Sequence, residues 1–414
     1  MVKAKTKSKN SLHSLKRKNR QEVLDVLRTS GPRPISELTL RTKLSKATVT
    51  NIIDFFLSEG LVLARGKGAS GEDGGKRPVL YAFNPDYRSV FCVKIDEDHM
   101  LAALTNLEGK IIASHGAFYD SGTSLDRILG LVRETFRTLI RRQDFEVGKC
   151  AAAVVGIHGV IDSERGVCFI SPHFSGWGTD IPFRDRIAAF LPDDMPVYVD
   201  NWIHYHAYGE IRLLPKKVDR FFLIGTDRDG LGGGLIIDGR IYRGFGSLAG
   251  EIGHIVVDFG ENAALCTCGG SGCFEASVAH PRLLARAKGE VKKHRKSTLH
   301  SQFARNGEIA FADVAEAADA GDAFARTVID WAAGYFALAV NNIMQVCDPE
   351  LVLIQGAYAQ AGRYFLESVA AKIQKVSLLG IRKNLQIAYS QLGDEGTIIG
   401  AGYYAADEHF ATID

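Results

Sequence analysis

The sequence lacks the features that mark secreted and membrane proteins. No uninterrupted apolar run reaches the roughly 18 to 20 residues that cross a bilayer, and the N-terminus has no apolar stretch of the kind a secretory signal needs. There are only seven cysteines, an odd number, and three of them fall within residues 266–273. These shortages predict a cytoplasmic protein with no membrane partner. Its thiols would stay reduced, and its clustered cysteines would bind a metal instead of forming a disulfide framework.

Acidic residues are absent from the first 20 positions, which carry eight Lys or Arg. Residues 1–88 hold 18 basic and 8 acidic side chains, so the rest of the chain carries a net charge of about −8. A run such as residues 1–20 is either a solvated tail or, beside a nucleic-acid module, a flexible basic arm that contacts phosphates. The division of charge predicts a basic head on an acidic body.

Residues 21–84 have the pattern of a winged helix-turn-helix domain. Apolar spacing predicts a helix that stops at Gly31 and Pro32, a short second helix, and a third helix capped by Ser45. The N-terminal part of this third helix carries small or hydrogen-bonding side chains suited to base edges in the major groove. We therefore expect DNA contacts from Lys46, Ala47, Thr48, Thr50 and Asn51.

Two short apolar runs, 61–64 and 79–83, flank a glycine-rich basic loop and predict a two-stranded wing. Lys76 and Arg77 stand at the base of this wing, where they would contact phosphate or the minor groove. Residues 85–89 then follow as a linker. The head thus predicts a double-stranded DNA operator as a partner.

From residue 90 onward, strand and helix patterns alternate in two successive α/β units. The first unit spans 90–200, and a final helix over 395–414 is expected to return to it. The second unit spans 201–394 and contains Asp238-Gly239 between apolar runs, a strong hairpin signal. With 46% hydrophobic residues to fill the cores, the pattern predicts two α/β lobes with a cleft between them.

The segment "CTCGGSGCFE" places Cys266, Cys268 and Cys273 in a glycine-rich loop, and His254 precedes it by twelve residues. Three cysteines and one histidine form a common ligand set for a structural zinc ion, one per chain. Unligated cysteines and an iron–sulfur cluster are the two alternatives.

Several motifs together resemble the ROK family of repressors, open reading frames and sugar kinases. They are "GIHGVID", "SPHFSGWG", "GEIGHIVVDFGENAALCTCGGSGCFE" and "NNIMQVCDPELVLIQG". The resemblance, which covers residues from about 15 to the C-terminus, implies an actin-like, hexokinase-like body of the ribonuclease H type. It also implies that His254 and the three cysteines bind zinc. Members with an N-terminal winged helix are mostly repressors of sugar-utilisation genes.

The resemblance also indicates where this chain departs from the kinases of the family. Their catalytic aspartate stands eight residues before a Gly-Glu glutamate, and that position here, counted back from Glu210, is Trp202. An indole accepts no proton from a sugar hydroxyl. The first phosphate-binding glycine turn is replaced by "KIDEDHML", which has no glycine. The chain is therefore predicted not to be an enzyme.

The positions that face the sugar in the family are better preserved. By resemblance, the ligand hydroxyls are held by Asn201, Glu251, His254 and Glu275. The two glutamates are alternatively ordinary exposed or salt-bridged carboxylates, and Trp202 either stacks on a sugar or fills the pocket. The sequence thus predicts a transcriptional regulator, a repressor of carbohydrate-utilisation genes that acts as a homodimer or higher oligomer with a sugar effector. An active sugar kinase with a DNA-binding head and a repressor gated by a protein partner are the alternatives.

Overall fold

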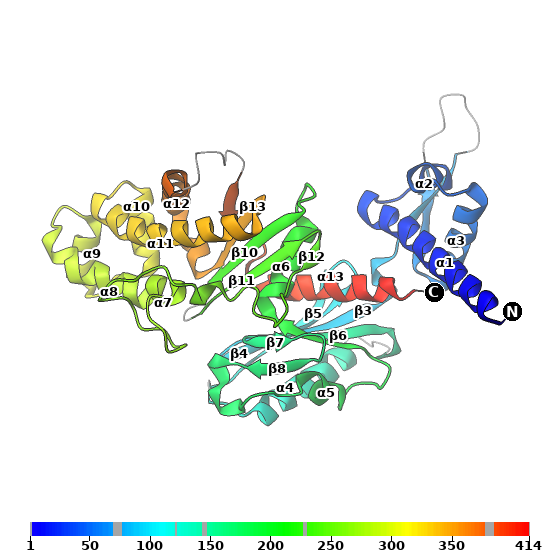
Figure 1. Ribbon diagram of the computed structural model, residues 1–414, viewed down its shortest axis with the longest axis horizontal. Helices are drawn as coiled ribbons and strands as arrows, with labels where there is room; N and C mark the ends of the chain where they lie inside the picture. The colour runs from blue at the N-terminus through cyan, green and yellow to red at the C-terminus, as the bar shows by residue number, and fades with distance from the viewer. Residues whose placement is uncertain are drawn as a thin grey trace.

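The computed structural model describes residues 2–68, 77–120, 122–142, 147–226, 230–376 and 385–413. Figure 1 shows a small helical head at one end of the molecule and two α/β lobes beyond it, with the C-terminus lying beside the head. This arrangement confirms the predicted winged head followed by a two-lobed body.

The head consists of three helices and a hairpin: α1 (Val2–Ser30), α2 (Ile35–Thr42), α3 (Lys46–Glu59), β1 (Val62–Lys67) and β2 (Val79–Phe83), with the two strands antiparallel. Ser45 caps α3 by accepting a hydrogen bond from the backbone N–H of Thr48. Gly60 ends the helix with a φ of 76°, a left-handed conformation that glycine adopts without strain. Ser45 thus sets the start of α3 where the sequence predicts it, and Gly60 sets its end.

The basic segment 1–20, expected as a separate arm, differs from that expectation. Helix α1 runs without interruption from Val2 to Ser30. The stretch contains neither glycine nor proline, so nothing in its sequence breaks the helix before Gly31. The basic residues therefore extend the first helix of the head.

Each lobe is built on a five-stranded mixed sheet, and the two sheets share one strand order. The first runs β5-β4-β3-β6-β9 and the second β12-β11-β10-β13-β14; in each, three antiparallel strands are followed by two parallel ones. The first-lobe strands are β3 (Ser89–Ile95), β4 (His99–Asn106), β5 (Ile111–Phe118), β6 (Cys150–Ile157) and β9 (Val197–Asn201). Those of the second lobe are β10 (Arg220–Thr226), β11 (Leu231–Ile237), β12 (Arg240–Ile241), β13 (Leu351–Gly356) and β14 (Gln386–Tyr389).

Helices and a small hairpin surround these sheets. In the first lobe they are α4 (Leu125–Arg142), α5 (Phe183–Ala188), and the paired strands β7 (Val160–Asp162) and β8 (Val167–Ile170). The second lobe carries α7 (Phe274–Val278), α8 (His280–Glu290), α9 (Thr298–Asn306), α10 (Phe311–Asp319), α11 (Ala323–Cys347) and α12 (Gly362–Val376). The predicted hairpin turn lies between β11 and β12, with positive φ at both Asp238 and Gly239.

Two helices lie between the sheets (Figure 1). Helix α6 (Trp202–Leu213) packs against α13 (Gly396–Ala411) and against strands of the second sheet, whereas α13 packs against β3, β4 and β6 of the first. The C-terminal helix thus returns to the first lobe, and α6 contacts both lobes.

Helix α11 has the length and composition of a membrane span, but most of its apolar window is buried in the second lobe. Phe336, Val340 and Met344 are among its side chains in that core. Its apolar character is explained by this packing.

Candidate functional site

Four predicted metal ligands come together at the edge of the second lobe. Ligand atoms of His254, Cys266, Cys268 and Cys273 all lie within 4.8 Å of one another. His254 ends a short turn after β12, and Cys273 directly precedes α7. The glycine-rich loop allows this because Gly272, at φ 74°, passes so close to the Asp258 carbonyl that a Cβ would lie 1.7 Å from the oxygen.

The distances in this cluster fit a tetrahedral zinc ion. Zn–S bonds of about 2.3 Å and Zn–N bonds of about 2.0 Å would separate two sulfurs by about 3.8 Å, and sulfur from nitrogen by about 3.5 Å. The Sγ atoms of Cys268 and Cys273 are 3.7 Å apart, and Cys266 Sγ lies 3.6 Å from His254 Nδ1. The residues present therefore form a Cys₃His set suited to zinc.

A cleft of about 710 Å³ lies beside this cluster, between the lobes. Three of the four residues expected to hold a sugar line it: Asn201, Glu251 and His254. Glu275 is not among the lining residues. Its Oε2 accepts a hydrogen bond of 2.8 Å from the backbone N–H of Leu231, and its Oε1 lies 3.8 Å from Cys266 Sγ. It thus links the start of β11 to the cysteine cluster.

Asn201 also has a structural task at the start of α6. Its Oδ1 accepts from the N–H of Ile203 and its Nδ2 donates to the carbonyl of Gly159 at 2.9 Å. Glu251 differs, because no described residue donates a hydrogen bond to its carboxylate, and burial raises its pKa. Of the two side chains, the glutamate has the freer acceptor atoms.

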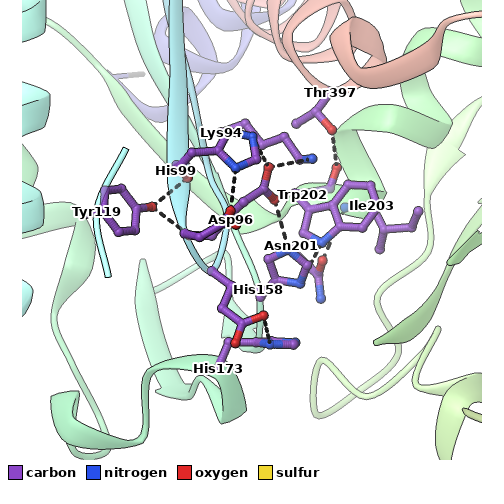
Figure 2. A network of polar contacts seen from close by, with 12 residues as sticks. Lys94, Asp96, His99, Tyr119, His158, His173, Asn201, Trp202, Ile203 and Thr397 are labelled. Atoms are coloured by element: carbon purple, nitrogen blue, oxygen red, sulfur yellow. Dashed lines mark hydrogen bonds and ion pairs between the residues drawn. The ribbon is translucent and has the colours of Figure 1, made fainter. Parts of the chain in front are cut away.

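Trp202 occupies the first turn of α6 and is buried within a polar network (Figure 2). Its indole Nε1 donates to His158 Nδ1 at 2.9 Å, and His158 Nε2 lies 3.0 Å from Asp96 Oδ1. Lys94 bonds Asp96 Oδ2 at 2.8 Å and lies 4.6 Å from the centre of the indole ring. The network fills the place that the family resemblance gives to the catalytic base.

Asp96 is ionised in this network. Burial alone would raise its pKa, but the hydrogen bond from His158 and the charge of Lys94 outweigh it and lower the pKa to about 2. His99 Nε2 adds a contact of 3.2 Å to Asp96 Oδ2, and Tyr119 donates to the Asp96 carbonyl (Figure 2). The segment that replaces the phosphate turn is thus held by its own Lys94 and His99 and by His158 and Tyr119 from outside it.

Asp200, two residues before the position of the catalytic base, is fully buried at the end of β9. One of its oxygens lies 2.8 Å from His204 Nδ1, and the other accepts from Arg243 at 2.7 Å. Burial raises its pKa, but these two partners outweigh it and the net shift is downward. The carboxylate is committed to this ion pair and does not line the cleft.

The head places the predicted base-reading side chains at the start of α3. Lys46, Ala47 and Asn51 are exposed, and Thr48 and Thr50 are half-buried. The Thr48 hydroxyl lies 2.8 Å from that of Ser45, so it takes part in the cap. Arg77, at the base of the wing, is exposed, whereas Lys76 lies outside the described residues.

One carboxylate joins the head to the body. Asp407 of α13 accepts from Arg28 of α1 at 2.8 Å and from the Tyr208 hydroxyl of α6 at 2.5 Å, and Arg212 also bonds it. Helix α6 begins at the cleft, which Trp202 lines, so a single helix reaches from the cleft to this junction. The motifs gave no signal for the junction or the Asp96 network, because their partners are far apart in sequence.

Comparisons with known proteins show what the chain resembles. The model of the ROK family matches residues 90–408. The xylose repressor of Caldicellulosiruptor bescii is 28% identical over 389 residues, which cover 93% of this chain and 94% of that protein. The glucokinase of Halalkalibacterium halodurans is 32% identical over 250 residues, covering 60% of this chain and 74% of the enzyme.

Among solved structures, a ROK family transcriptional regulator, a homologue of the Escherichia coli Mlc protein, has a TM-score of 0.79 at 22% identity. The match covers 96% of this chain and 97% of that one. It shows that head and body together follow a known fold.

Proposed function

Because the chain belongs to the ROK family, we propose that it is a sequence-specific, DNA-binding transcriptional regulator, a repressor of carbohydrate-utilisation genes. The observation that carries the proposal is the extent of the match to the xylose repressor. The match covers 93% of this chain, so it must include most of the DNA-binding head as well as the body. The match to the glucokinase covers 60% of the chain.

The head supports this function through the start of α3. Asn51 is exposed there beside Lys46 and Ala47, so an amide, an ammonium group and a small side chain are available on one helix end. Thr48, Thr50, Lys76 and Arg77 complete the proposed DNA contacts. A homodimer would present two such helices to half-sites one helical turn apart.

The body supports a sensory role and not a phosphotransferase role. At the position of the base stands Trp202, whose indole N–H is already used by His158, and Asp200 is held in a buried ion pair. Neither can take the proton of a sugar hydroxyl. We propose that a sugar or sugar derivative binds through Asn201, Glu251, His254 and Glu275 instead, and that one zinc ion per chain fixes the loop carrying the last two.

Ligand binding would be linked to DNA binding by movement of the lobes. The ligand closes the cleft, α6 moves with it, and the contact of Tyr208 with Asp407 carries the change toward Arg28 in the head. Two reoriented heads no longer match the spacing of the half-sites. The proposal requires that the ligand bind the closed state more tightly than the open one.

The test is operator binding. Genome-wide footprinting would identify bound sites, and fluorescence titration with one such site would compare Asn51→Ala with Ser58→Ala, an exposed control at the other end of α3. The first substitution is expected to cost about 1 to 3 kcal/mol on the specific site alone. Equal losses on all sequences would refute base reading by Asn51. ATP turnover with any sugar would refute the non-enzymatic role.

A further inference from the structure

We infer that the effector is a glycoside larger than one sugar ring, whose second unit lies on an apolar wall contributed by the first lobe. The inference rests on the proposed sugar-sensing function and concerns the same cleft. The cavity, at about 710 Å³, falls within the range of roughly 300 to 1,000 Å³ that encloses drug-sized ligands, which are larger than one pyranose ring.

The two sides of this cleft differ in chemistry. Glu251 and His254 come from the second lobe and, with Asn201, supply polar atoms for sugar hydroxyls. The first lobe contributes Val160, Ile170 and Pro172 to the opposite wall, together with His158 and His173. One end of the cleft is thus suited to a sugar ring and the other to an apolar group.

In this first-lobe wall the two ring nitrogens of His158 are already occupied. Trp202 Nε1 and His158 Nδ1 bond each other, and His158 Nε2 bonds Asp96 (Figure 2). The carbon atoms of the His158 and His173 rings, with Val160, Ile170 and Pro172, are therefore what this wall offers to an apolar group or to the C–H face of a second sugar ring. The described residues that line the cleft include no lysine or arginine.

Two exposed apolar side chains that line the cleft also support this inference. Ile170, at the end of β8, is 47% exposed, and Leu248, in the loop after β12, is 62% exposed. Single exposed apolar residues are ordinary, but these two come from different lobes and line the same cleft. An apolar group bound between them would remove both from water.

The experiment is calorimetric titration of the full chain with matched probes: D-xylose and D-glucose, and the methyl and phenyl β-glycosides of each. We expect a phenyl glycoside to bind about tenfold more tightly than the methyl glycoside of the same sugar, because only the phenyl ring reaches the apolar wall. Ile170→Ser should remove most of this preference while leaving the affinity for the methyl glycoside unchanged.

Leu248→Ser provides a second test should Ile170→Ser fold poorly, and Val346→Ser, exposed on α11 and not a lining residue, is the control that keeps the preference. Equal affinity for monosaccharide, methyl and phenyl probes would overturn the inference while leaving the sugar sensor intact. Binding of none of the probes would overturn both, and operator titration with the same preparation would still decide the DNA-binding role.

Discussion

Behind the first-lobe wall of the cleft, Asp96 is bonded by Lys94 and by the lining residue His158, whereas on the second-lobe wall Glu251 has no donor among the described residues. The pKa values follow this difference. The partners of Asp96 lower its pKa to about 2, and burial raises that of Glu251.

The difference shows that the position of a carboxylate at a kinase-like cleft does not by itself make it a catalytic or binding group. The polar groups at the first-lobe wall bond one another, and these bonds stabilise the fold. The second wall leaves polar atoms unpaired, which costs stability and keeps them available to a ligand. The four substitutions below separate these two uses, in order of decreasing effect on stability.

Loss of a metal ligand at the second-lobe wall should reduce stability more than the other three substitutions. Cys268→Ser removes one of four ligands, so zinc content should fall well below one per chain, and the free energy of unfolding should fall by on the order of 5 kcal/mol. Metal analysis and urea unfolding measure the two quantities. Cys347→Ser, at a half-buried thiol outside the cluster, is the matched control and should retain the zinc. Full zinc content in Cys268→Ser would contradict the assigned ligand set.

Asp200→Asn, at the buried end of β9, should have the next largest effect on stability. The substitution leaves Arg243 and His204 without their shared carboxylate inside the protein, which costs about 3 to 5 kcal/mol for a buried ion pair. Urea unfolding at neutral pH measures the loss. A change under 1 kcal/mol would mean that this pair does not stabilise the β9–α6 corner.

Asp96→Asn should cost about 2.5 kcal/mol at pH 7, the equivalent of lowering a carboxyl pKa from 3.8 to about 2 at about 1.4 kcal/mol per pKa unit. Because the folded state lowers this pKa, the contribution is complete above pH 4 and is lost as the pH falls toward 2. The difference between wild type and variant should therefore shrink over that interval. Asp126→Asn, at an exposed carboxylate on α4, should change stability by less than about 0.5 kcal/mol. A pH-independent deficit for Asp96→Asn would contradict the assignment.

The sequence predicted the histidine–cysteine cluster because three of its residues fall within eight positions and glycines let the loop turn. It predicted the Ser45 cap of α3 and the turn at Asp238 for the same reason, since each depends on neighbours in the chain. The Asp96–His158–Trp202 network could not be predicted in this way, because 62 and 44 positions separate its members and only the sheet order brings them together. The hydrogen bond that Glu275 accepts from the backbone of Leu231, 44 positions away, could not be predicted in this way either.

Glu251→Gln should change stability least, by no more than about 0.5 kcal/mol, because no described donor loses a partner and the variant removes a desolvated charge. Its effect should appear instead in ligand binding, where an amide accepts fewer hydrogen bonds from sugar hydroxyls than a carboxylate, and affinity should fall by about tenfold or more. Calorimetry with the tightest-binding glycoside and urea unfolding of the same sample measure both. Because Asp96→Asn is the corresponding amide substitution on the opposite wall, it should show the reverse: a large loss of stability with a small loss of affinity for the sugar ring. If Glu251→Gln and Asp96→Asn lost stability and sugar affinity in the same proportion, the result would contradict the assignment of Asp96 to stability and of Glu251 to ligand binding.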